Sequence, residues 1–156
     1  MLLVTALSAV AMGLAWPARA ALPGWWELGS FIVVAFLLDQ SSTRLKVEAS
    51  GSTSFVIHMA AGILFGAFWG AVVAATSTML AMFAAKVSLR KIVFNASQRA
   101  LCVLVAVAAY TGLGGGMPPA YLQVVGGVDS VALQRDFLLF FVFAAVYFAV
   151  NSLAVS

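Results

Sequence analysis

The stretch FVIHMAAGILFGAFWGAVVAATSTMLAMFAA, from Phe55 to Ala85, contains no Asp, Glu, Lys or Arg. As one helix it would be about 46 Å long, which exceeds a hydrocarbon core of about 30 Å. Two glycines bound the segment Gly66-Ala-Phe-Trp-Gly70 in its middle, and glycine interrupts regular structure. We therefore predict two short helices, at about residues 53–66 and 70–86, that form a hairpin; one strongly tilted helix is the alternative.

The overall composition is typical of a membrane protein. Hydrophobic residues make up 64% of the 156 residues, charged residues make up 8%, and the mean hydropathy is +1.10, whereas roughly a quarter of the residues in a soluble domain are charged. Eight Lys and Arg and five Asp and Glu residues give a net charge of +3. The basic residues lie beside apolar segments, so we expect the lipid bilayer as partner and no nucleic acid. One cysteine, Cys102, allows no internal disulfide, and no Cys/His cluster predicts a metal site. We expect no cofactor.

Apolar runs on both sides of the quoted stretch complete the prediction. The expected fold is an all-α integral membrane protein, a bundle of about six transmembrane helices in a single domain over residues 1–156. The expected helices cover about residues 2–16, 25–38, 53–66, 70–86, 93–112 and 137–155. Polar loops are expected at residues 39–54 and at Gly112 to Asp136. A signal peptide cleaved near Ala18-Arg19-Ala20 is the alternative for the first helix and would leave five crossings.

Basic residues are unevenly shared between alternate loops. One side of the predicted bundle, a basic rim, collects Arg44, Lys46, Lys86, Arg90 and Lys91, and the other side has Arg19 and Arg135. Because cytoplasmic loops are enriched in Lys and Arg, we expect the basic rim to face the cytoplasm. Both termini would then be cytoplasmic, in a multi-pass membrane protein.

Five polar residues within the apolar runs are candidates for contact with a ligand or with another helix. Asn95, Gln98 and Arg99 share one helix face, because they are spaced i, i+3 and i+4. Interhelical hydrogen bonding, with Arg99 reaching toward the headgroups, is favoured over a ligand-contact or signal-relay face. For His58 we favour a hydrogen-bonded packing role over a proton sensor. Asn151 is expected to bond to a neighbouring helix.

Small residues recur in the quoted stretch. Gly62, Gly66 and Gly70 repeat every four residues, and this spacing permits close approach of helix backbones in a membrane. Helix packing is the favoured interpretation, and a turn at Gly66 and Gly70 is the alternative.

The sequence contains no recognisable catalytic arrangement. No nucleophile and base, and no pair of carboxylates within an apolar run, can be identified. The glycine triplet Gly114-Gly115-Gly116 lacks the Lys-Ser/Thr of a phosphate-binding loop. We therefore expect no enzymatic activity.

Short motifs follow one another in a definite order: Ser52-Thr53-Ser54-Phe55, then Gly66 to Gly70, Arg90-Lys91, Val93-Phe94-Asn95-Ala96-Ser97-Gln98, and Tyr147 to Ser152. In this order, over about residues 25–156, they resemble a bacterial membrane module found ahead of HD-GYP and GGDEF domains in cyclic-di-GMP signalling proteins. The resemblance implies a membrane sensor or anchor with a cytoplasmic output domain after the last helix. Two departures are Gly66-Ala67, where the family often has Gly-Pro, and the end of the chain at Ser156.

The functional prediction is a non-catalytic membrane module that senses or anchors for a cytoplasmic signalling partner or for a C-terminal output domain absent from this chain. One alternative is a small accessory subunit of a larger membrane complex, such as an energy-transducing or photosynthetic assembly. A second is the substrate-binding component of a vitamin-type transporter, in which Asn95, Gln98 and His58 would line a pocket.

Overall fold

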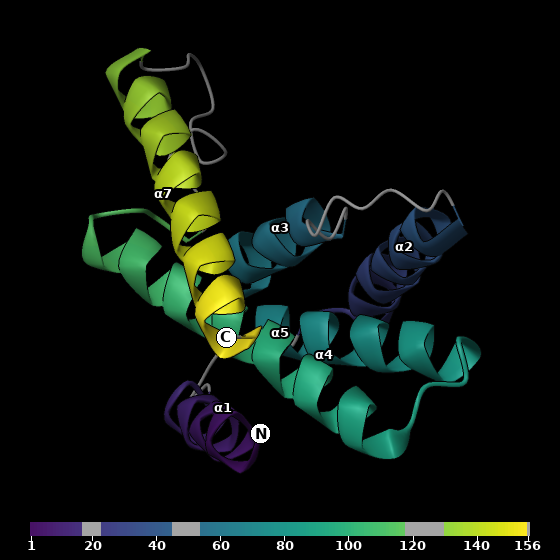
Figure 1. The fold of residues 1–156 in the computed structure, drawn as a ribbon. Helices are drawn as coiled ribbons and strands as arrows, with labels where there is room; N and C mark the ends of the chain where they lie inside the picture. The colour runs from purple at the N-terminus through teal and green to yellow at the C-terminus, as the bar shows by residue number, and fades with distance from the viewer. Residues whose placement is uncertain (17–22, 45–53, 118–129, 156) are drawn as a thin grey trace.

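The structure, a computed structural model, describes residues 1–16, 23–44, 54–117 and 130–155. These residues form six α-helices and no β-strand (Figure 1), which confirms the predicted helical class for this part of the chain. The helices are α1 (Leu2–Leu14), α2 (Trp25–Arg44), α3 (Phe55–Phe65), α4 (Ala67–Ala84), α5 (Leu89–Gly112) and α7 (Ser130–Val155).

Three of the described helices are able to cross a membrane by length and composition: α4 over Ala67–Ala84, α5 over Leu89–Gly112, and α7 over Gln134–Ala154. This is fewer than the six crossings predicted. α1 has 13 residues and α3 has 11, so at about 20 Å and 16 Å both are shorter than a core of about 30 Å. The difference arises because an apolar run shows where a chain avoids water but does not fix how far its helix extends.

Several helix boundaries also differ from the prediction. α2 continues through residues 39–44, which were predicted to begin a loop. α5 begins at Leu89, and α7 begins at Ser130 within the predicted long loop. The cause is that a helix continues after its apolar residues end. Side-chain bonds to the helix backbone accompany this extension: Ser41 Oγ, for example, donates to the carbonyl of Leu38 at 2.8 Å. The predicted cleavage site near Ala18-Arg19-Ala20 lies outside the described residues.

The α3–α4 hairpin turns at a single residue. Gly66 lies between the two helices with φ 89° and ψ 168°, a conformation that residues with a Cβ rarely adopt. Gly70, predicted to bound the turn, lies instead within α4. A Cβ placed on Gly70 would be 2.5 Å from the Cα of Gly62, so the backbones of α3 and α4 are in direct contact at this pair of glycines.

Hydrogen bonds and ring contacts fix which helix ends lie together. The side chain of Gln40 donates to the carbonyl of Ala81 at 3.2 Å, so α2 and α4 end side by side. Gln98, the tenth residue of α5, bonds to Asn151 near the end of α7. We define the basic end of the bundle as the C-terminal ends of α2 and α4 and the N-terminal end of α5.

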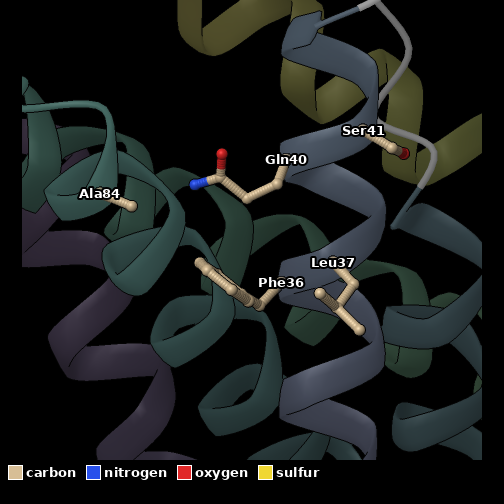
Figure 2. Close-up of a pocket in the computed structure, with 5 residues that line it drawn as sticks. All are labelled: Phe36, Leu37, Gln40, Ser41 and Ala84. Carbon is tan, nitrogen blue, oxygen red and sulfur yellow. The ribbon is translucent and has the colours of Figure 1, made fainter.

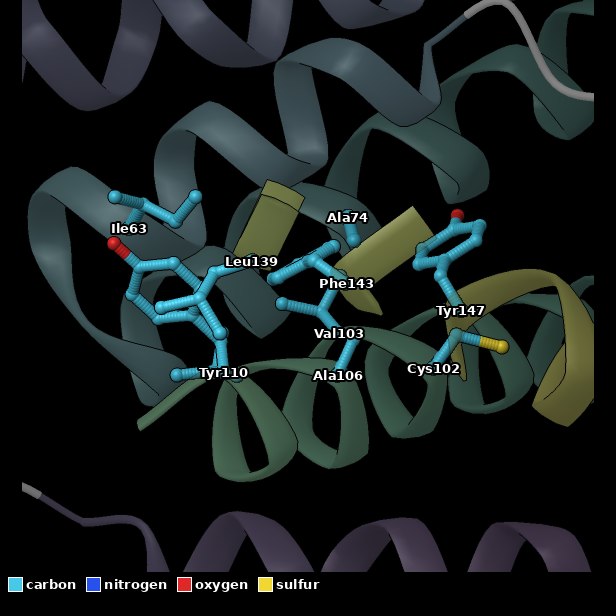
Figure 3. Close-up of a cluster of buried hydrophobic side chains, with 10 residues drawn as sticks. Ile63, Ala74, Cys102, Val103, Ala106, Tyr110, Leu139, Phe143 and Tyr147 are labelled. Atoms are coloured by element: carbon cyan, nitrogen blue, oxygen red, sulfur yellow. The ribbon is translucent and has the colours of Figure 1, made fainter. Parts of the chain in front are cut away.

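The main core lies between α5 and α7 and is closed by α3 and α4. Figure 3 shows Tyr110, Phe143 and Tyr147 in one row against the small side chains of α5. All three rings are fully buried, and the Tyr110 ring stacks on Phe140 with centroids 6.2 Å apart. α5 is the central helix, since it contacts α1, α3, α4 and α7.

The outward surface of α7 is apolar from Phe137 to Ala149. Phe137, Leu138 and Phe141 are 60%, 65% and 60% exposed, while Leu139 and Phe143 on the same helix are buried. A soluble helix of this kind would carry polar residues on its outer face. A helix that is apolar on its outer face as well as on the face toward the core is typical of contact with lipid.

Candidate functional site

The candidate site is a row of polar side chains that joins four helices in the membrane-helix core. His58 of α3 is fully buried. Its Nδ1 lies 3.2 Å from the hydroxyl of Tyr147 on α7, and its Nε2 lies 3.1 Å from Oγ of Ser77 on α4. Arg99 of α5 donates from Nη1 to the same Tyr147 hydroxyl at 3.1 Å. We call Arg99, Tyr147, His58 and Ser77 the polar chain.

One arrangement of protons satisfies every bond in the polar chain. Arg99 can only donate, so the Tyr147 oxygen accepts from it and Tyr147 donates its proton to Nδ1 of His58. His58 is then a neutral imidazole that donates from Nε2–H to Ser77, and Ser77 Oγ donates to the carbonyl of Ala74 at 3.2 Å. A doubly protonated His58 would leave the Tyr147 hydroxyl proton without an acceptor in the polar chain and would bury a second cation beside Arg99. The geometry therefore favours the neutral form.

Arg99 ends the polar chain and is half-buried. Its guanidinium carbon lies 6.0 Å from the centroid of the Tyr147 ring, within the range of a cation–π contact. Among the described residues, the Tyr147 hydroxyl is the one group that accepts a hydrogen bond from Arg99. The other donors of the guanidinium are therefore available.

The remaining predicted contact residues lie around the polar chain toward the basic end. The Gln98 amide donates to the backbone carbonyl of Asn151 at 2.9 Å and to its Oδ1 at 3.0 Å, so these two residues join α5 to α7. Asn95 donates to the carbonyl of Lys91, one turn earlier, at 2.9 Å. The structure thus brings His58 and Arg99 together through Tyr147, places Gln98 on Asn151, and leaves Asn95 bonded within its own helix.

Two members of the polar chain, Ser77 and Tyr147, were not predicted as site residues. The signal for Ser77 is the run Thr76-Ser77-Thr78, three hydroxyl residues in an otherwise apolar helix. The signal for Tyr147 is its spacing of four from Asn151, which puts both side chains on one face of α7.

The four residues of the predicted basic rim that the structure describes all lie at the basic end. Arg44 is the last residue of α2, Lys86 follows α4 with a positive φ of 57°, and Arg90 and Lys91 lie in the first turn of α5. Lys46 lies outside the described residues. Arg135, near the start of α7, is at the opposite end.

A pocket of about 510 Å³ opens at the basic end between α2 and α4. Figure 2 shows Gln40 reaching from α2 toward the helix that carries Ala84, with Phe36 one turn below. Leu37 and Ser41 complete the lining. The predicted ligand-contact residues His58, Asn95 and Gln98 do not line this pocket.

Asp136, near the start of α7, is a further buried polar residue that the sequence analysis missed. It has no exposed surface, and neither carboxylate oxygen has a hydrogen-bond partner in the described part of the chain. Its sequence signal is weak, because Asp136 follows Arg135 at the edge of an apolar run and resembles a solvated helix end. No group of three or more His, Cys, Asp or Glu that could hold a metal occurs among the described residues.

Comparisons with protein-family models, with curated proteins and with solved structures find no match to this chain.

Proposed function

We propose that this chain is a non-catalytic integral membrane module that senses or anchors, with its basic end in the cytoplasm of a bacterial cell. The observation that carries the proposal is the gathering of Arg44, Lys86, Arg90 and Lys91 at one end of the bundle. Loops rich in Lys and Arg remain on the cytoplasmic side. Asn151, four residues before the end of α7, bonds to Gln98 of α5, and in this proposal α7 also ends on the cytoplasmic side.

The polar chain supports a sensing role. It connects α7 to α3, α4 and α5 through hydrogen bonds from side chains that have few other partners. A change in any of these helices therefore alters the polar contacts that hold α7. In this proposal the end of α7 passes such a change to a protein partner or output domain in the cytoplasm.

Single-cysteine labelling tests the orientation on which this function depends. In a Cys102→Ala background, Ser88→Cys places a thiol at the basic end and Leu113→Cys places one at the other end; both positions are exposed. A membrane-impermeant maleimide is added to intact bacterial spheroplasts. We expect Leu113→Cys to be labelled at once and Ser88→Cys only after permeabilisation. The reverse pattern would overturn the proposal.

The pocket beside Gln40 favours a second candidate, a substrate-binding component of a transporter. Its volume of about 510 Å³ is in the range of small-molecule sites, about 300–1,000 Å³. Thermal unfolding of the detergent-purified protein with a panel of vitamins tests this candidate. A raised unfolding midpoint that is lost in Phe36→Ala supports it, and no shift with any vitamin in the panel counts against it.

A further inference from the structure

The guanidinium of Arg99 has more donors than the protein satisfies. It carries five N–H groups, and among the described residues it donates one hydrogen bond, to Tyr147, and forms no ion pair. A cation at membrane depth is costly unless an anion or water neutralises it. The unused donors therefore mark a place where a negative group would be stabilised.

The direction of the side chain shows where this place opens. Arg99 lies ten residues after Leu89, the first residue of α5, so its Cα is about 15 Å along the helix. Side chains on a helix tilt toward the N-terminus, and the N-terminus of α5 is at the basic end. The Arg99 side chain is therefore inclined toward the basic rim, and it is half-buried, not enclosed.

Two more polar residues continue this face of α5 toward the boundary. Lys91, Asn95 and Arg99 are spaced by four residues, so their side chains follow one another along one face. Lys91 is exposed, and Asn95 uses one of its two amide protons on the carbonyl of Lys91. We call these three residues the α5 anion face.

We infer that the α5 anion face binds a phosphate group, with Arg99 as its deepest contact. Arg99 supplies paired N–H donors, which match the oxygens of a phosphate. Lys91 adds a second positive charge at the entrance, and the free amide proton of Asn95 lies between them. The phosphate belongs either to an anionic lipid headgroup or to a soluble phosphate-bearing ligand. This inference rests on the proposed insertion in a membrane and adds a ligand class to the proposed sensor.

Thermal unfolding of the full chain in an uncharged maltoside detergent tests the inference. The additives are phosphatidylglycerol, inorganic phosphate, and phosphatidylcholine as a lipid without net charge. We expect phosphatidylglycerol, inorganic phosphate or both to raise the unfolding midpoint of the wild type in a saturable way, and phosphatidylcholine not to do so. A shift with phosphatidylglycerol alone identifies a lipid headgroup, and a shift with inorganic phosphate identifies a soluble ligand.

Three variants separate this site from general charge effects. Arg99→Gln should weaken the apparent affinity at least about tenfold, since a charge-assisted hydrogen bond contributes about 1.5–3 kcal/mol. Lys91→Gln should weaken it by less, and because Lys91 is exposed this variant retains the fold. Arg135→Gln removes an equal charge at the opposite end and should bind like the wild type.

Two results would overturn the inference: no midpoint shift with either anionic additive, or an equal loss of binding in Lys91→Gln and Arg135→Gln. The labelling experiment reports on orientation without any ligand. A protein that labels as expected but fails to bind phosphate or phosphatidylglycerol would therefore contradict the anion face and leave the membrane module intact.

Discussion

Individual polar residues in this protein are informative because the hydrocarbon surroundings offer them no water. An unpaired polar group in such surroundings raises the free energy of the folded state by roughly several kcal/mol. A polar side chain in an apolar run is therefore expected to hydrogen-bond to a partner. This requirement allowed interhelical hydrogen bonding to be predicted for His58, Gln98 and Asn151. Their partners could not be predicted, because the sequence does not specify how α3, α4 and α7 are rotated about their axes.

The polar chain makes a prediction that can be tested by a double-mutant cycle. His58→Ala removes the hydrogen bonds that Tyr147 and Ser77 make to the imidazole, and Tyr147→Phe removes the bonds that His58 and Arg99 make to the hydroxyl. We expect each single variant to lower the free energy of unfolding, and the two losses to be non-additive by about 1 kcal/mol. Reversible unfolding in mixed detergent micelles gives all four values. Additivity within experimental error would mean that His58 and Tyr147 are not coupled.

At Asp136, in contrast, we predict that a substitution stabilises the protein. Its carboxyl group is buried without a hydrogen-bond partner among the described residues, so a nearly isosteric neutral residue should lower the cost of burying this position. Asp136→Asn should raise the thermal unfolding midpoint by roughly a few degrees. Arg135 is an exposed neighbour, and Arg135→Gln should leave the midpoint nearly unchanged. A lower midpoint in Asp136→Asn would show that the carboxylate has a stabilising partner.

Among the helices, the α3–α4 hairpin depends on small residues at one contact. A Cβ on Gly70 would lie 2.5 Å from the Cα and 2.7 Å from the backbone nitrogen of Gly62, and a backbone cannot move aside as a side chain can. Gly29 in α2 has no atom within 4 Å of the same position. Gly70 and Gly29 therefore form a matched pair for substitution: Gly70 is in a tight contact, and Gly29 faces open space.

Alanine substitution at this pair should have effects of opposite sign. Gly70→Ala should destabilise the protein by about 1–3 kcal/mol, because α3 and α4 must separate. Gly29→Ala should be neutral or stabilise by up to about 1 kcal/mol, since alanine favours a helix. Unfolding in detergent measures both. Equal effects would mean that α3 and α4 are not in contact at Gly62 and Gly70.

The sequence predicted which segments are helical better than where each helix ends. The hairpin within Phe55 to Ala85 follows from length alone, because one helix would overshoot the membrane. The extension of α2 to Arg44 and the early start of α7 at Ser130 were not predictable from hydropathy. Polar residues remain helical when a helix leaves the apolar region, and only their backbone hydrogen bonding shows it.

At the scale of the whole molecule, the arrangement of helix ends depends on long-range contacts. The bonds from Gln40 to Ala81 and from Gln98 to Asn151 place residues far apart in sequence at one end of the bundle. The count of basic residues predicted that the loops near Arg44 and Lys86 share a side. The number of full crossings was not predictable, because the short helices α1 and α3 are as apolar as the longer ones.

The central claim is that a bilayer surrounds the apolar outer face of this protein, including Phe137, Leu138 and Phe141. The most direct measurement is the distribution of the full chain between membrane and buffer after alkaline carbonate extraction of cells that express it. We expect the protein to remain in the membrane pellet and to enter solution only with detergent. Recovery of a folded monomer in detergent-free buffer would contradict the claim.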